Sequence, residues 1–195
     1  MQFIQEYSSE ITEKASQEIL NFYRDHIMSG TRESCNLHGV VNEVALEDEN
    51  VLKIIKDKIL PQVEKRLDNY FSFSPLLDKT SYYLKHCSIM HHKEGLNLPF
   101  HYDAEFVYDT ADGENIRNFA VLVYLNKDFK GGELIFPVQG KSICPKPGLI
   151  VIFPTSFMYP HTTNPAFGSD RFVLRLNYLF KKDGIKKNVQ NSEVY

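Results

Sequence analysis

The chain has 195 residues, of which 43% are hydrophobic, and a net charge of −3 at pH 7. This length and composition predict one globular domain over residues 1–195 with a sizeable core. The acidic balance provides no overall field for nucleic acid or an anionic membrane, so neither is an expected partner.

The N-terminal residues and the cysteines bear on location. MQFIQEYSSEITEK has neither a basic nor an apolar targeting segment, and no later stretch has the length and apolarity of a membrane span. Cys35, Cys87 and Cys144 are far apart and form no CxxC pair, which is typical of buried thiols in a reducing compartment. We therefore expect a cytoplasmic protein.

Two amphipathic helices are predicted in the first third of the chain. Apolar residues recur mostly at three- and four-residue steps from Ile4 to Tyr23, and again from Leu46 to Phe71. Pro61 lies within the second pattern and is expected to kink or restart that helix. Residues 30–42 are expected to form a loop with room for a short strand. Residues 1–75 are thus predicted to be a helical support.

From Ser81 onward the pattern changes to short β-type runs separated by Gly and Pro. The candidate strands are 82–90, 98–103, 119–126, 134–136, 142–144, 149–153, 159–163 and 171–180. Roughly eight strands at this spacing predict a sandwich or barrel over residues 80–180. Helices that precede such a sheet cover one of its faces, so the predicted class is α+β, mainly β. Residues 181–195 are polar and are expected to form a solvated tail.

His101, Asp103 and His161 are the candidate metal ligands. Two imidazoles and one carboxylate can occupy one face of a non-haem Fe(II) and leave the opposite face open. Residues i and i+2 of a strand point the same way, which would bring His101 and Asp103 to one ion. A second pair of this spacing, His92 and Glu94, leads into a turn at Gly95 and is expected at the surface or behind the ligands.

Arg171 begins an alternating run that places Val173, Arg175 and Asn177 on the same strand face. An inward-facing guanidinium is costly unless it meets an anion or other partners. A bound dicarboxylate would satisfy Arg171, because a guanidinium and a carboxylate form paired hydrogen bonds. For Arg175 an internal ion pair is the favoured interpretation. His92, Arg175 and Asn177 are candidates for contact with a substrate or with the ligands.

Five segments in order resemble the prolyl-4-hydroxylase type of Fe(II)/2-oxoglutarate-dependent dioxygenases. They are residues 95–103, 117–126, 131–137, 147–153 and 161–171. The resemblance covers roughly residues 82–180, and it implies a double-stranded β-helix, or jelly roll, with the N-terminal helices packed on one sheet. It also implies Fe(II) bound by His101, Asp103 and His161, and 2-oxoglutarate whose far carboxylate is held by Arg171 and Tyr124.

The family resemblance further implies the reaction. An unactivated C–H is hydroxylated with O2, and 2-oxoglutarate is converted to succinate and CO2. Because Asp103 keeps the carboxylate that related halogenases lack, hydroxylation is favoured over halogenation. Two departures weaken proline as the substrate: His92 stands where many prolyl hydroxylases have tyrosine, and Arg171 stands where most collagen-type members have lysine.

Several alternatives stay open. The substrate is a free amino acid or small metabolite, or a peptidyl residue such as proline, and the compact chain mildly favours the small substrate. Residues 108–115 form either a lid or a solvent loop. The chain could instead be a non-catalytic jelly-roll binding module with His101 and His161 as core histidines. A nucleic-acid demethylase of the same superfamily is a further alternative, favoured by the lysines at 181–187 and disfavoured by the net charge.

Overall fold

The computed structural model describes residues 3–27, 35–37, 41–45, 48–72, 77–104, 106–109 and 113–181. Its helical elements are α1 (Glu10–Phe22), η1 (Tyr23–Ile27), α2 (Glu49–Ile54), η2 (Ile55–Ile59) and α3 (Leu60–Phe71), of which η1 and η2 are π-helical. Its strands are β1 (Gln5–Tyr7), β2 (Cys35–Leu37), β3 (Val41–Ala45), β4 (Tyr82–His92), β5 (Phe106–Asp109), β6 (Gly113–Tyr124), β7 (Lys130–Gly131), β8 (Leu134–Phe136), β9 (Lys141–Ile143), β10 (Ile150–Pro154), β11 (Thr162–Thr163), β12 (Ala166–Phe167) and β13 (Arg171–Phe180).

Local sequence explains where the helices begin. Ser9 caps α1: its Oγ accepts from the Thr12 N–H, and Thr12 Oγ1 accepts from the Ser9 N–H. Asp48 caps α2 by accepting the backbone N–H of Asn50. Pro61 lies in the first turn of α3, directly after the π-helical turn η2. Helical residues run without a break from Glu49 to Phe71, so the helix changes from π to α near this proline and does not restart there.

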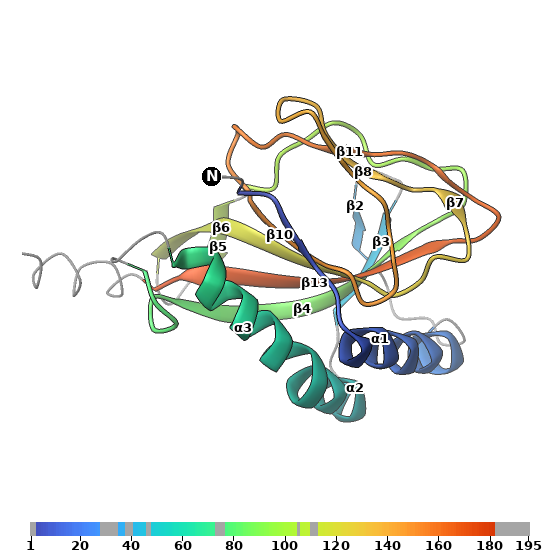
Figure 1. Cartoon of the computed structure of the whole chain (residues 1–195), viewed down its shortest axis with the longest axis horizontal. Coiled ribbons are helices and arrows are strands. Elements are labelled where there is room, and N and C mark those ends of the chain that lie inside the picture. Colours follow the sequence, from blue (N-terminus) through green and yellow to red (C-terminus); the bar gives the residue numbers. More distant parts are fainter. Residues whose placement is uncertain are drawn as a thin grey trace, which may run out of the picture.

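One large antiparallel sheet organises the described part of the chain. Its strand order is β1-β10-β6-β13-β4-β3-β2, and β5 pairs with β6. The small sheets β11-β8-β9 and β12-β7 complete the jelly roll. The helices lie along one face of the large sheet, and β8 and β11 lie over the other (Figure 1). The predicted α+β, mainly β jelly roll with helices on one sheet is confirmed.

The alternation of β13 separates two hydrophobic cores. Its residues Phe172, Leu174, Leu176 and Tyr178 join the cluster packed against the helices. Val173 points the other way and joins the cluster inside the jelly roll. This is the two-faced pattern predicted for residues 171–180, and it leaves Arg171 and Arg175 on the interior side.

Several element predictions are wrong in detail. Ile4 lies before α1 next to β1 rather than in a helix, and the apolar Ile11 of α1 is exposed. Residues 1–75 are not purely helical, because β1, β2 and β3 add strands to the large sheet. The expected strand at 98–103 is reduced to a single bridge at His101. The strand expected from residue 119 starts at Gly113, and the one at 159–163 is reduced to Thr162–Thr163.

Three other expectations meet the structure only partly. Cys87 is buried as predicted, whereas Cys144 is exposed. Residues 182–195 of the predicted tail lie outside the described residues, and the assignment of 1–195 to a single domain stays a prediction. None of the described helices combines the length and the apolar character that crossing a membrane requires.

Candidate active site

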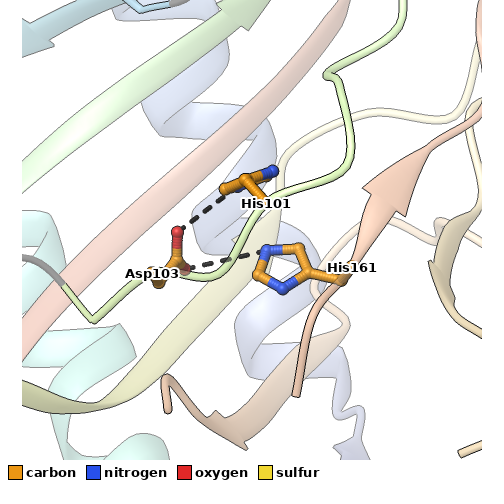
Figure 2. A group of neighbouring side chains, drawn as sticks. All are labelled: His101, Asp103 and His161. Carbon is orange, nitrogen blue, oxygen red and sulfur yellow. Dashed lines mark ion pairs between the residues drawn. The ribbon is translucent and has the colours of Figure 1, made fainter. Parts of the chain in front are cut away.

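Two histidines and one aspartate converge inside the jelly roll. Nε2 of His101 lies 3.4 Å from Oδ1 of Asp103, and Nε2 of His161 lies 3.8 Å from Oδ2 of the same carboxylate (Figure 2). One donor atom from each residue lies within 4.8 Å of the other two. Two nitrogens and one oxygen at this separation fit a non-haem Fe(II) that keeps its other positions open.

The backbone brings these residues together without the predicted strand. His101 and His161 form an isolated antiparallel bridge, with N···O distances of 3.0 and 2.8 Å. The following turn of chain is tied down where the Ala104 N–H donates to the Thr155 carbonyl at 2.9 Å. The strand-phasing argument for His101 and Asp103 is therefore wrong, although the juxtaposition that it predicted is present.

Both imidazoles are oriented by backbone carbonyls. Nδ1 of His101 lies 2.7 Å from the Pro99 carbonyl, and Nδ1 of His161 lies 3.1 Å from the Tyr159 carbonyl. A carbonyl only accepts, so each Nδ1 carries a proton. In the neutral form of each ring the lone pair is therefore on Nε2, which is the atom that faces Asp103 and the tautomer that a metal ligand needs.

The surroundings of His161 keep it neutral. Its ring lies 5.2 Å from that of Phe136 and 5.0 Å from that of Phe153. Burial lowers the pKa of His161 below its usual value, although the Asp103 carboxylate acts in the opposite direction. A neutral imidazole is the form that binds a metal, so the apolar wall favours the ligating state.

Arg171 is the most deeply buried charged side chain of this region, at 1% exposure. Its NH1 donates to the Gly132 carbonyl at 2.7 Å, and its NH2 donates to His92 Nδ1 at 2.7 Å and to Thr163 Oγ1 at 3.1 Å. All three acceptors are neutral. Its buried Nε meets no acceptor within the described residues. Such a guanidinium fits a carboxylate ligand, because a buried charge is costly without a counter-charge.

Tyr124 lies close to Arg171 in the same pocket. Burial raises the pKa of its phenol to about 12, while the charge of Arg171 acts to lower it. The phenol is therefore a hydrogen-bond donor at neutral pH, as an acceptor carboxylate requires. Thirteen described residues line the pocket: Met90, His92, Leu98, His101, Asp103, Leu122, Tyr124, Leu134, His161, Thr163, Arg171, Val173 and Arg175.

The three candidate substrate residues differ in position. His92 is buried and accepts from Arg171; burial, and next the charge of Arg171, lower its pKa well below the usual value. It therefore lines the pocket as a buried residue and does not lie at the protein surface. Arg175 lines the pocket, and its expected ion pair stays a prediction. Asn177 is buried on β13 but is not among the described residues that line the pocket.

The sequence reasoning missed two partners of Arg171, Thr163 and Gly132. Thr163 had a usable signal, since it follows His161 by two residues and so shares its side of an extended segment. Gly132 contributes only a carbonyl, which no side-chain pattern reveals. Residues 108–115 are predicted to form either a lid or a solvent loop. Part of this segment pairs as β5 and β6, residues 110–112 lie outside the described part, and the lid stays a prediction.

The chain is similar to a known protein family and to solved structures. Residues 86–179 match the family model described as the 2OG-Fe(II) oxygenase superfamily, and this segment includes all the proposed ligands. A search of curated proteins finds no match.

Solved structures share the fold at low sequence identity. A viral collagen prolyl hydroxylase from Paramecium Bursaria Chlorella virus-1, in a 2OG complex, aligns with a TM-score of 0.70 and 19% identity, covering 93% of this chain and 97% of its own. A Pseudomonas putida prolyl-4-hydroxylase gives 0.60 and 18%, covering 92% of each chain. A Trichoplax adhaerens prolyl hydroxylase bound to a hypoxia inducible factor peptide fragment gives 0.64 and 19%, covering 98% and 88%.

Proposed function

Because this chain belongs to the 2OG-Fe(II) oxygenase superfamily, and is thus an enzyme that uses Fe(II), 2-oxoglutarate and O2, we propose that it hydroxylates an unactivated C–H bond. One observation carries the proposal. The two histidines, the aspartate and the buried arginine line a single pocket, so a metal and a dicarboxylate can be held side by side.

Each residue has a definite task in this proposal. Nε2 of His101, Nε2 of His161 and the carboxylate of Asp103 hold the iron. The Arg171 guanidinium binds the far carboxylate of 2-oxoglutarate, and the Tyr124 phenol donates a second hydrogen bond to it. When bound, iron and 2-oxoglutarate supply the activation of O2: one oxygen atom goes to the substrate carbon and the other to succinate, and CO2 leaves.

The pocket walls protect this chemistry. Leu98, Leu122, Leu134 and Val173 line it with apolar surface, so bulk water has little access to the far carboxylate. In the drier site the charge–charge contact with Arg171 is stronger than it would be in water. The Asp103 carboxylate occupies the position that a halide would need, which favours hydroxylation over halogenation.

For the substrate we propose a prolyl group, peptidyl or free, as the first class to test. The fold neighbours described above carry prolyl hydroxylase names. The residues flanking His101 support an apolar substrate, since Phe100 is 60% and Tyr102 53% exposed beside the metal site. A second exposed pair, Phe157 and Met158, lies in the segment leading to His161.

The test couples succinate formation to mass spectrometry. Purified protein with Fe(II), 2-oxoglutarate and O2 is offered free L-proline, proline-containing peptides and the other free amino acids. We expect one class to raise succinate above the substrate-free rate and to gain one oxygen atom. If the protein bound no iron and formed no succinate with any substrate offered, the enzyme proposal would be contradicted. If added methylated DNA or RNA instead lost a methyl group as formaldehyde, the demethylase alternative would be favoured.

A further inference from the structure

We propose that Asn126 is a positioning residue for the co-substrate: its side-chain amide holds the backbone on both sides of Arg171 and so aims the guanidinium into the pocket. The inference rests on the proposed function, because that function assigns Arg171 to the 2-oxoglutarate carboxylate. Asn126 itself is not among the described residues that line the pocket.

The amide of Asn126 bonds the two peptide groups that flank the Arg171 Cα. Its Oδ1 accepts the Phe172 N–H at 2.9 Å, and its Nδ2 donates to the Asp170 carbonyl at 2.8 Å. Peptide groups are planar, so holding both of them fixes the two backbone dihedrals of the residue between. Asn126 is 5% exposed, which shields these bonds from competing water.

On the side of β13 that faces β6, the strand ladder does not extend as far as Arg171. The ladder between β6 and β13 ends at the pair Tyr124 and Val173, two residues beyond Arg171 along β13. One further backbone bond follows, from the Leu125 N–H to the Phe172 carbonyl at 3.0 Å. Beyond this bond, the Asn126 side chain supplies the hydrogen bonds that a neighbouring strand would otherwise make. They lie next to Arg171, whose guanidinium must be oriented toward the pocket.

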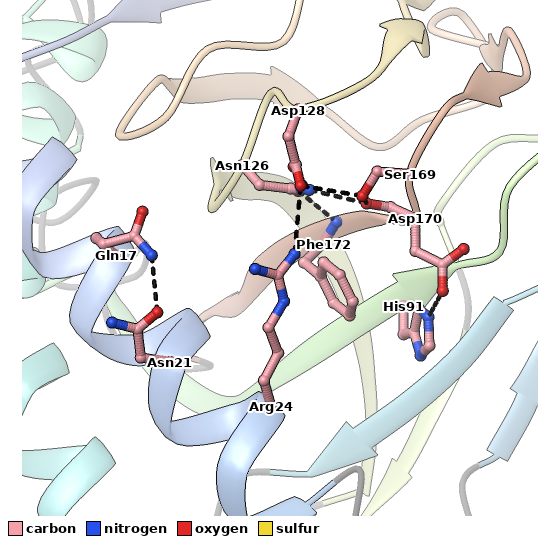
Figure 3. Close-up of polar contacts among 9 residues, drawn as sticks. All are labelled: Gln17, Asn21, Arg24, His91, Asn126, Asp128, Ser169, Asp170 and Phe172. Atoms are coloured by element: carbon pink, nitrogen blue, oxygen red, sulfur yellow. Dashed lines mark hydrogen bonds and ion pairs between the residues drawn. The ribbon is translucent and has the colours of Figure 1, made fainter.

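A second set of contacts fixes the amide itself. Nδ2 of Asn126 also donates to Asp128, whose other oxygen accepts from Ser169 Oγ at 3.1 Å and lies 3.5 Å from the Arg24 guanidinium (Figure 3). Because Asp128 can only accept when ionised, the nitrogen of the amide must face it. The amide oxygen of Asn126 then faces the Phe172 N–H, so the side-chain amide has a single orientation.

The residue before Arg171 is anchored to the neighbouring strand as well. The Asp170 carboxylate accepts the Glu94 N–H at 2.8 Å and lies 2.6 Å from His91 Nε2 (Figure 3). His91 stacks on Phe172 with ring centroids 4.6 Å apart. These contacts lie on the helix-facing side of the sheet, opposite the pocket. They can therefore act on the co-substrate only through the position of Arg171.

The test uses Asn126→Asp, a replacement of almost equal shape. It keeps an oxygen for the Phe172 N–H, loses the donor to the Asp170 carbonyl and sets a second carboxylate against Asp128. For 2-oxoglutarate binding to the Mn(II)-loaded protein, measured by calorimetry without O2, we expect about tenfold weaker affinity, as for other residues that orient a ligand-binding group. Mn(II) affinity is expected to stay within about twofold. The matched control is Asn21→Asp, an exposed amide on α1 that accepts from Gln17.

A double-mutant cycle separates positioning from general stability. A lysine ammonium is a point charge and does not need the fixed orientation of a planar guanidinium. Asn126→Asp should therefore reduce 2-oxoglutarate affinity much less in the Arg171→Lys background than in wild type. Equal losses in both backgrounds, or wild-type affinity in Asn126→Asp, would overturn the inference. If Asn126→Asp does not fold, Asp128→Ala replaces it, with a smaller loss expected and an unchanged affinity again overturning it. Wild-type protein that binds Mn(II) but no 2-oxoglutarate would instead contradict the proposed function.

Discussion

At the scale of single residues, Arg171 has the strongest requirement for a ligand. Its charge is buried, and its three hydrogen-bond acceptors are a carbonyl, a hydroxyl and a neutral imidazole. Burial lowers the pKa of Arg171, while Tyr124 and Glu133 act to raise it. A dianion bound in the pocket would supply the missing counter-charge, which explains why such a costly group is kept there.

Replacing Arg171 should therefore weaken co-substrate binding selectively. For Arg171→Gln we expect a 2-oxoglutarate dissociation constant about 10- to 100-fold higher, since a hydrogen bond to a charged group contributes roughly 1.5–3 kcal/mol. Equilibrium dialysis of the Mn(II) protein measures it, and Mn(II) affinity serves as the internal control. Unchanged 2-oxoglutarate affinity, with a loss in Arg175→Gln, would place the carboxylate at Arg175.

His92 gives a pH-dependent prediction for the metal-free protein. Burial and the nearby Arg171 charge place its folded pKa well below 6.5. In the unfolded chain His92 is protonated near pH 6.5, whereas in the folded protein it stays neutral at that pH. The free energy of unfolding therefore falls as the pH drops below about 6.5. In urea unfolding from about pH 7.5 to about pH 5.5, His92→Gln should lose less stability than wild type. Identical pH dependence in the two proteins would contradict this assignment.

At the scale of elements, the turn before β10 is packed tightly against α1. A Cβ on Gly148 would overlap the backbone of Thr12 and Glu13, and the residue has φ +73°. Gly140 has a similar φ of +61°, but a Cβ there would meet nothing within 4 Å. The two glycines thus share the backbone requirement and differ in the space around them.

This difference predicts unequal effects of alanine. Gly140→Ala should lower the free energy of unfolding by about 1 kcal/mol, the cost of a side chain in the left-handed region. Gly148→Ala should cost about 1–3 kcal/mol more, because α1 must also move. Chemical denaturation measures both variants. Equal losses would mean that α1 does not approach the turn as closely as described.

The elements also show what a single sequence can and cannot predict. Residues 134–136 and 171–180 have the predicted bounds because each is a mainly apolar run with turn or charged residues on both sides. β1 and the bridge at His101 contain no such apolar run. Their backbone bonds are chosen by distant partners, Ile152 for Gln5 and His161 for His101, which no local pattern encodes.

At the scale of the whole molecule, the large sheet separates support from chemistry. One face packs against the helices, and the other closes the pocket with β8 and β11. Residue type and spacing, together with family resemblance, predict the proposed metal ligands and Arg171. They do not predict Thr163, Gly132 and Asn126, because these residues contribute hydrogen bonds that exist only once the strands have closed around the pocket.

The central claim is that His101, Asp103 and His161 hold the iron that couples O2 to 2-oxoglutarate in this pocket. The most direct test is succinate formation by wild type and Asp103→Ala, with Fe(II), 2-oxoglutarate and O2 supplied together or with one omitted. Asp57→Ala, an exposed acid on the helical side, is the matched control. We predict that wild type and Asp57→Ala form succinate only when all three are present, and that Asp103→Ala forms none and no longer binds the metal. Succinate formation that survives in Asp103→Ala, or that needs no iron in wild type, would contradict the claim.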